Sequence, residues 1–220
     1  MATAAPRNLT VGTILDKMFA VIERSMAASL IYFVVLGALN VALGYYTLGV
    51  IAPLPVLGSA ALKFVIGVIA AFFVLDAMVG NTGLRSRTDG DVFLSYLVLS
   101  VIYTICLVLG FIVIVLPGLY IMARWIIAQP LLVARGGSPM KALGESWERT
   151  KDKEFPILLA LLVVLVPVIA ITIVCTLMLG RDNLTGMIIS QLTSSAGGVL
   201  ALAMGVAILG LLDSRERATG

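Results

Sequence analysis

Three charged side chains stand inside long apolar runs of this sequence, where charged residues could do chemistry in lipid. Lys63, Asp76 and Arg124 each interrupt a stretch that is otherwise apolar. An ionised side chain near the centre of a bilayer costs about 2.5 to 3.5 kcal/mol on insertion scales, so such a residue marks a functional site by default. Arginine suits bidentate contacts with phosphate, and lysine offers a point charge on a flexible stem. Lys63 and Arg124 are therefore candidates for binding a lipid headgroup or another anion.

Lys63 and Asp76 lie in the same run, and each also has a structural interpretation. Lys63 is roughly two turns from one end of the run, so its stem can carry the ammonium group to the interface. Asp76 lies near the other end, shortly before Arg85 and Arg87 in the sequence. An ion pair with that basic loop would satisfy its carboxylate.

Arg124 has no obvious protein counter-ion. Counted from Gly118 at about 1.5 Å per residue, its Cα lies about 9 Å inside the outer edge of its run. On that outer side the sequence offers one acid, Asp182. Two alternatives stay open: an anionic lipid phosphate, or structural pairing with free backbone carbonyls or interior amides. The amides, which together with Asp76 we expect in a polar interior, are those of Asn40, Gln129 and Gln191.

Residues for catalysis or metal binding are scarce. The chain has no histidine, which removes the commonest general base and the commonest transition-metal ligand. Cys106 and Cys175 lie in apolar runs and are expected to be free thiols that pack as small hydrophobes. Asp89 and Asp91 lack the other ligands of a calcium loop and are expected to form a turn. We therefore expect no metal, no cofactor and no enzymatic activity.

The elements that must position the charged residues are membrane-spanning helices. Hydrophobic residues make up 60% of the 220 residues and charged residues 12%, which is more apolar surface than one soluble core can bury. A helix needs about 20 apolar residues to cross a bilayer. The sequence predicts a single all-α integral membrane domain over residues 1–220, a six-transmembrane-helix bundle. The six runs are 26 to 52, 57 to 80, 92 to 116, 118 to 135, 156 to 179 and 187 to 212.

The basic residues are distributed unevenly about these runs. With a cytoplasmic N-terminus, twelve of the 15 Lys and Arg residues fall on the cytoplasmic side, Arg181 falls outside, and two lie within spans. The positive-inside rule then predicts a bacterial cytoplasmic (inner) membrane protein with both termini cytoplasmic. The net charge of only +3, without a polybasic tract, indicates no nucleic-acid partner. The twelve are Arg7, Lys17, Arg24, Arg85, Arg87, Arg135, Lys141, Arg149, Lys151, Lys153, Arg215 and Arg217.

Two further segments have the spacing of amphipathic helices at the cytoplasmic side of the membrane. Residues 9–24 place apolar side chains at helical intervals opposite charged ones, and residues 139–151 repeat the design behind Ser138 as N-cap. Aromatic side chains favour the headgroup boundary. We therefore expect Phe19 and Trp147 to be interfacial anchors.

Small residues recur at helical spacing in the first and last runs. Gly37 and Gly44 flank Asn40 on one face, which predicts a hydrogen bond from Asn40 across a close helix contact. A second series in the last run predicts close packing, either within the chain or with a protein partner or a second copy. It comprises Gly197, Ala201 and Gly205.

Residues 14 to 19 together with 116 to 155 resemble the membrane domain of glycerophosphoryl diester phosphodiesterases, most sharply over residues 116 to 153. The resemblance rests on a Pro-Gly turn, an arginine, an A-x-P-L-L-V run and an A-L-x-x-S-W-x-x-T-K segment. It implies an all-helical membrane bundle in which phosphodiesterase chemistry belongs to a separate domain that some members carry. We expect a stand-alone relative without that domain, so no catalytic residue is inferred. The matching residues are Pro117, Gly118, Arg124, Ala128, Pro130, Leu131, Leu132, Val133, Ala142, Leu143, Ser146, Trp147, Thr150 and Lys151.

Three functions fit these observations. The first is a non-enzymatic, lipid-contacting accessory, scaffold or regulatory module whose partners include membrane lipids, among them anionic phospholipid. The second is a small permease or exporter for an anionic or amphipathic substrate that uses the buried arginine. The third, a membrane lipid hydrolase, has the least support because the sequence offers no catalytic constellation.

Overall fold

The computed structural model describes residues 9–47, 53–87, 92–113, 115–179 and 183–219, and within these ranges it holds nine helices and no strand. Six segments are long and apolar enough to cross a membrane, which confirms the predicted all-α membrane class. The expected turn at Asp89 and Asp91, and the acid Asp182, lie outside the described residues. The helices are α1 (Val11–Arg24), α2 (Met26–Thr47), α3 (Pro53–Asn81), α4 (Phe93–Val113), α5 (Val115–Trp125), α6 (Ala128–Arg135), α7 (Pro139–Arg149), α8 (Glu154–Leu179) and α9 (Leu184–Thr219).

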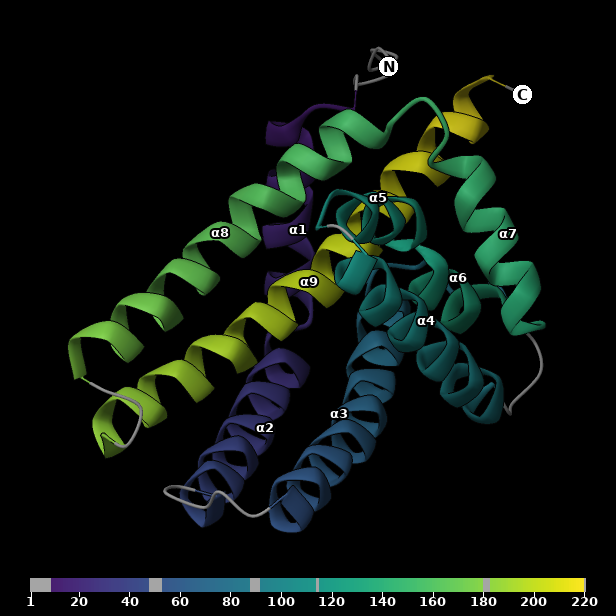
Figure 1. Cartoon of the computed structure of the whole chain (residues 1–220). Helices are drawn as coiled ribbons and strands as arrows, with labels where there is room; N and C mark the ends of the chain where they lie inside the picture. The colour runs from purple at the N-terminus through teal and green to yellow at the C-terminus, as the bar shows by residue number, and fades with distance from the viewer. Residues whose placement is uncertain (1–8, 48–52, 88–91, 114, 180–182, 220) are drawn as a thin grey trace.

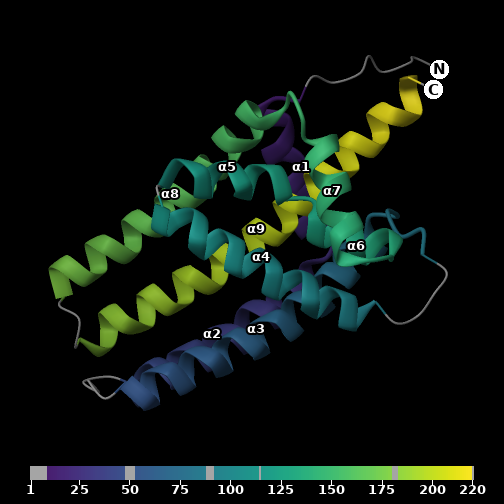
Figure 2. The same ribbon diagram turned by 45° about the vertical axis from the view of Figure 1, so that its right-hand side comes forward.

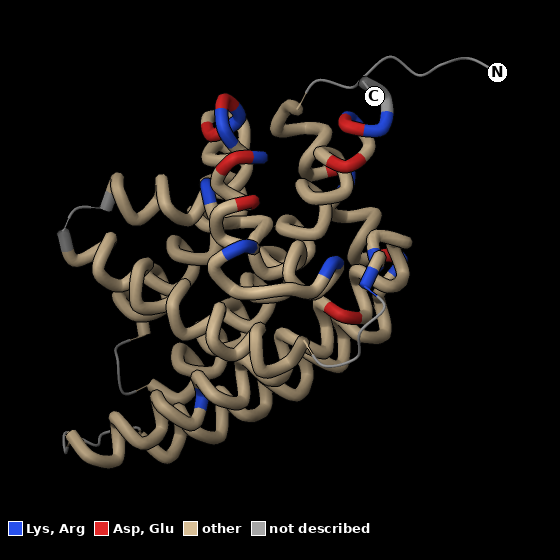
Figure 3. Tube along the Cα trace, turned by 90° about the vertical axis from the view of Figure 1, so that its right-hand side faces the viewer, with Lys and Arg blue, Asp and Glu red and all other residues tan. Residues whose placement is uncertain are grey.

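Helix α9 runs the length of the molecule and packs on α1, α2 and α8. Figures 1 and 2 show α2 beside α3 and α8 beside α9, with the apolar ends of these pairs pointing the same way. The start of α1 and the end of α9 lie at the opposite end. Figure 3 shows most Lys, Arg, Asp and Glu positions gathered towards that end. The charged end is the one that the sequence predicts to be cytoplasmic.

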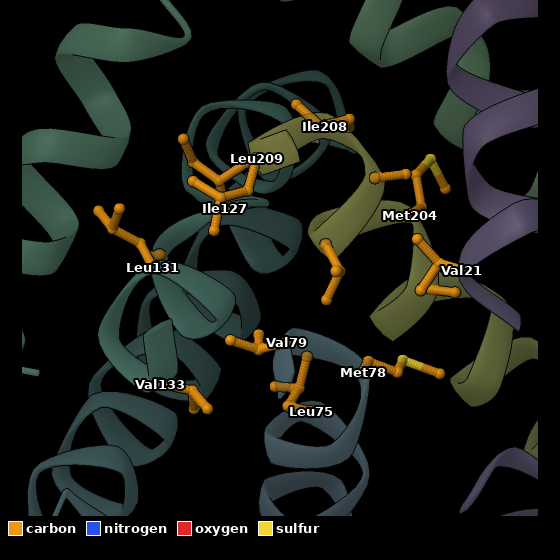
Figure 4. Packing of buried hydrophobic residues seen from close by; sticks show 14 of the residues in the cluster. Val21, Leu75, Met78, Val79, Ile127, Leu131, Val133, Met204, Ile208 and Leu209 are labelled. Carbon is orange, nitrogen blue, oxygen red and sulfur yellow. The ribbon is translucent and has the colours of Figure 1, made fainter. Parts of the chain in front are cut away.

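Fully buried apolar side chains gather where α1, α3, α6 and α9 meet. Figure 4 shows Val21, Met78, Ile127 and Met204 gathered in one cluster, and each is at most 1% exposed. Burial of a large apolar side chain contributes about 1.5 to 3 kcal/mol. This cluster therefore ties α1 and α6 firmly to the longer helices.

Helix α1 shows why its sequence folds as it does. The Thr10 hydroxyl accepts a hydrogen bond from the Thr13 backbone N–H, and the Thr13 side chain bonds back to the Thr10 backbone, which forms a capping box. Ile14, Met18 and Val21 follow at helical spacing and are buried. The predicted apolar spacing of α1 thus packs against the other helices, and the location of α1 and α7 at a membrane surface stays a prediction.

The predicted fourth span, 118 to 135, is two helices separated by Ile126 and Ile127. Pro130 explains the interruption, because it has no N–H for the carbonyl of Ile126 and its ring crowds that carbonyl. The freed oxygen lies against α9, where a Cβ at Gly205 would come within 2.8 Å of it. Gly205 therefore makes room for the break.

Helices α4 and α5 form a close hairpin. A Cβ at Gly110 would lie 3.1 Å from the Cα of Gly118, so the two backbones nearly touch. The expected turn at Pro117 and Gly118 is misplaced by a few residues, because α5 already begins at Val115. Proline is tolerated in the first turn of a helix, where its missing N–H is not needed. Figures 1 and 2 both show this hairpin ending short of the apolar ends of α2 and α8.

Candidate functional site

Arg124, in the last turn of α5, is 2% exposed and has a protein counter-ion. Its Nη1 donates a hydrogen bond of 2.8 Å to Oε1 of Glu154, the first residue of α8. Its guanidinium carbon lies 4.4 Å from the ring centroid of Trp147 and 5.9 Å from that of Tyr120. The expectation that Arg124 lacks a protein counter-ion was therefore wrong. It assumed an uninterrupted span entered from the outer side, whereas the end of α5 meets the start of α8.

The backbone of Arg124 is held as firmly as its side chain. The hydroxyls of Ser146 and Thr150 donate hydrogen bonds of 2.8 and 3.0 Å to its carbonyl oxygen. An uninterrupted helix would satisfy that oxygen from the N–H of residue 128, but the break ends α5 first. The hydroxyls of Ser146 in α7 and of Thr150, the C-cap residue of α7, thus cap the end of α5.

This cluster of Arg124, Glu154, Trp147, Ser146 and Thr150, which we name the arginine cluster, joins α5, α7 and α8. A cation over an aromatic face contributes about 0.5 to 2 kcal/mol, more when water is excluded. The Nε of Arg124 is buried with no hydrogen-bond partner among the described residues. Its charge is nevertheless matched by Glu154. The geometry therefore supports the structural alternative for Arg124, and the cluster offers no nucleophile with an adjacent base.

Sequence reasoning missed Glu154, Ser146 and Thr150 as partners of Arg124. Ser146 and Thr150 are among the residues that carry the family resemblance, and they share one face of α7 at a spacing of four. That shared face was the available signal. Glu154 had no signal, because 30 positions separate it from Arg124.

Asp76 binds the basic loop, as its structural interpretation predicts. Its carboxylate lies 2.6 Å from an amino group of Arg85 and 2.6 Å from one of Arg87. Lys63, the other charge on α3, is half-buried and has no ion pair within the described part of the chain. Its role in binding an anion stays a prediction.

Two of the three interior amides pair with serine hydroxyls and not with Arg124. Asn40 Nδ2 donates a hydrogen bond of 3.2 Å to the hydroxyl of Ser195, across the contact between α2 and α9. This confirms the predicted cross-helix bond. Gln129 Nε2 lies 3.4 Å from the Ser100 hydroxyl in α4. Gln191 lies against Gly44, where a Cβ would come within 3.0 Å of its Nε2.

The predicted anchors and small-residue positions have different surroundings. Phe19 is 60% exposed on α1, whereas Trp147 stacks on Arg124.

Gly197 faces Val168 of α8, with 3.2 Å between its ideal Cβ and Cγ1 of the valine. The glycine face of α9 is thus filled by the chain's own helices. A protein partner or second copy on such a face stays a prediction.

A network of charges joins α6, α7 and α9 at the charged end. Arg149 pairs with Asp213 and Glu216, and Arg135 pairs with Asp213 and Glu145. Burial lowers the pKa of Arg149, but hydrogen bonds to Asp213 and Glu216 outweigh it and raise the pKa above its ordinary value. Arg149 therefore stays charged, and the ion pairs of both arginines hold the three helices together.

Two apolar hollows accompany these contacts. The first is an apolar groove of about 330 Å³ between α1, α2 and α9, which we name the lateral groove. The second is an inner cavity of about 230 Å³ beside the break between α5 and α6, where Tyr103 and Gln129 provide polar groups. Within the described ranges, no group of three His, Cys, Asp or Glu side chains could hold a metal ion. Both cysteines are free, and both are partly buried.

Comparison with known proteins assigns the family. Residues 93–213, from α4 through most of α9, match the family described as the membrane domain of glycerophosphoryl diester phosphodiesterase. No curated protein and no solved structure gives a significant match. The matched region spans more than half of the chain and includes the whole arginine cluster. The chain therefore belongs to this membrane-domain family, which confirms the resemblance carried by residues 116 to 153.

Proposed function

We propose that this chain is a non-enzymatic, lipid-contacting module of a bacterial cytoplasmic membrane, with both termini in the cytoplasm, that acts as an accessory, scaffold or regulator. The lateral groove carries this proposal. Its walls are apolar except for Ser29, and its rim includes Phe19, Met26 and Leu30, which are 60%, 54% and 55% exposed. Exposed apolar side chains at the boundary of a bilayer are suited to contact with lipid acyl chains.

The occupant that fits the groove is a lipid acyl chain. The groove lies between two membrane-spanning helices, α2 and α9, and the amphipathic helix α1. Its walls offer dispersion contacts and almost no hydrogen bonds, as an alkyl chain requires. A lipid held there would fix α1 at the cytoplasmic boundary of the bilayer.

Filling the groove tests the proposal. Ala196 lines the groove, so Ala196→Phe would occupy it, whereas Ala38→Phe adds the same ring to an exposed position of α2 outside it. We expect wild type and Ala38→Phe to retain one more phospholipid than Ala196→Phe when released from nanodiscs for native mass spectrometry. Equal retention by all three folded proteins would contradict a lipid site in the groove.

The inner cavity favours a second function, that of a small permease or exporter. Transporters place substrates near the bilayer midplane beside interrupted helices. Here the cavity adjoins the break that Pro130 imposes, and the amide of Gln129 and the ring of Tyr103 line it. An amphipathic molecule could place its apolar part in this cavity and its polar part at these groups.

Transport is tested by flux. Ala201 lines the inner cavity, and Ala201→Phe would fill it, again with Ala38→Phe as the matched control. The assay is efflux of a fluorescent fatty acid from proteoliposomes. Flux above that of protein-free vesicles, lost in Ala201→Phe and kept in the control, would replace the first proposal with the second. On the first proposal, all proteins equal the protein-free vesicles.

A further inference from the structure

A separate pocket opens at the charged end of the molecule. It has a volume of about 170 Å³ and lies between α1, the turn after α3 and the last turns of α9. At about 30 Å³ for each water molecule in the liquid, it has room for a small polar group. Its polar side chains are those of Lys17, Thr82, Asp213, Ser214 and Arg217.

The pocket contains more positive than negative charge. Asp213, its single acid, is committed to Arg135 and Arg149. Lys17 and Arg217 have no ion pair with any residue in the described ranges. Two cations without matching acids in one concavity create a positive potential that attracts an anion.

The neighbouring backbone directs these groups. The stem of Lys17 packs on α9 at Gly210, where a Cβ would lie in ordinary contact at 3.8 Å from its Cε. Gly83, at φ +70°, forms the tight turn that closes the pocket, and this backbone conformation favours glycine. The hydroxyl of Thr82 already donates to the carbonyl of Met78. Recognition therefore falls to the two cations.

We propose that this pocket binds a phosphate group, either in the headgroup of an anionic phospholipid or as free phosphate. A lysine and an arginine together can balance the negative charge of a phosphate group, and arginine also offers paired N–H donors to its oxygens. The site lies where the sequence predicts the cytoplasmic headgroups, and basic pockets at that depth suit anionic lipids. It is distinct from the lateral groove and from the arginine cluster, and only its placement at the cytoplasmic headgroups rests on the proposed function.

A matched pair of double variants tests the site. Lys17→Gln with Arg217→Gln removes the two pocket cations. Lys141→Gln with Lys151→Gln removes the same net charge from exposed positions outside the pocket. Each protein is reconstituted in nanodiscs of phosphatidylcholine with phosphatidylglycerol, and its retained lipids are identified by native mass spectrometry. We expect phosphatidylglycerol to bind at least about tenfold more weakly to the pocket variant than to wild type or the control.

A second arm separates the two phosphate sources. Inorganic phosphate is titrated into each protein in a neutral detergent, with melting temperature as the readout. Stabilisation of wild type and control but not of the pocket variant identifies free phosphate as a ligand, whereas lipid retention without this effect identifies the headgroup. If both double variants behave alike in both arms, the proposal is overturned.

A third variant guards against misfolding. Ser214→Asp keeps both cations and places a carboxylate in the pocket, at an exposed position where the fold tolerates it. We expect the same loss of phosphatidylglycerol at an unchanged melting temperature. Undiminished binding by this folded variant would also overturn the proposal. The groove variant Ala196→Phe should leave phosphate binding intact, which distinguishes a failure here from a failure of the proposed function.

Discussion

Glu154→Gln is the sharpest test of the arginine cluster. Removing one partner of a fully buried ion pair costs about 3 to 5 kcal/mol. The side chain of Arg124 is 3% exposed and that of Glu154 is 28% exposed, so water reaches one side of the pair. Glutamine can still accept one hydrogen bond from Nη1. We therefore expect the free energy of unfolding to fall by about 1 to 3 kcal/mol.

The assay is reversible unfolding in mixed micelles with a denaturing detergent. Glu148→Gln, an exposed change on α7, is the control and should alter stability by less than about 0.5 kcal/mol. The double variant of Glu154→Gln and Arg124→Met should be less destabilised than the sum of the single variants, because no buried charge is left unpaired. If Arg124 instead binds a lipid phosphate, Glu154→Gln would strengthen retention of anionic lipid without loss of stability. That result, or equality of Glu154→Gln and Glu148→Gln, would refute the structural role.

Three more predictions follow from the packing and from the family. Gly205→Ala places a Cβ 2.8 Å from the carbonyl oxygen of Ile126. We expect this variant to lower the free energy of unfolding by about 1 to 3 kcal/mol in the same unfolding assay. Gly67→Ala, where a Cβ would meet nothing within 4 Å, should raise it by up to about 1 kcal/mol. Asn40→Leu removes the bond to Ser195 and should cost about 0.6 to 1.7 kcal/mol, and no loss would show that the bond is not formed in the membrane. The purified protein should release no headgroup from labelled phospholipid, and release above a protein-free control would revive the lipid hydrolase.

Features that depend on local spacing could be predicted from the sequence. The long apolar runs gave the spanning segments, since crossing a bilayer needs length and hydrophobicity alone. The pairing of Asp76 with Arg85 and Arg87 followed from their proximity in the chain, and the bond from Asn40 followed from its glycine-flanked face. In each case the structure adds the distance and the partner atom.

The arginine cluster could not be predicted, because it depends on where two helices end. Pro130 gave a local signal for the break, since it removes a bond to Ile126, but nothing local shows that α5 then ends beside α8. Arg124 was expected to lie within a single span, counted from Gly118. It was therefore expected to lack a protein counter-ion, whereas Glu154 at the start of α8 pairs with it.

The charge count used for orientation could not resolve the hairpin either. The segment between the end of α4 and Arg124 carries no charged residue. A hairpin that crosses the bilayer twice and one that turns back inside it place the same residues on the same sides. The distribution of charge therefore predicts the side on which the hairpin of α4 and α5 begins and ends, but it does not predict how far the hairpin reaches across the bilayer.

Arg135 and Arg149, whose ion pairs reach the end of α9, act first during membrane insertion and then in the folded protein. On the predicted orientation, Arg135 and Arg149 help to keep their loop cytoplasmic while the chain is being inserted. Their partners Asp213 and Glu216 lie more than 60 residues later in the chain and therefore emerge from the ribosome afterwards. The guanidinium groups are therefore unpaired while the chain is being inserted. They form ion pairs that hold the helices together once α9 has packed against them. The number of basic residues in the sequence therefore exceeds the number of unpaired cations in the folded protein. Lys17 and Arg217 are among the cations that have no ion pair with a described residue.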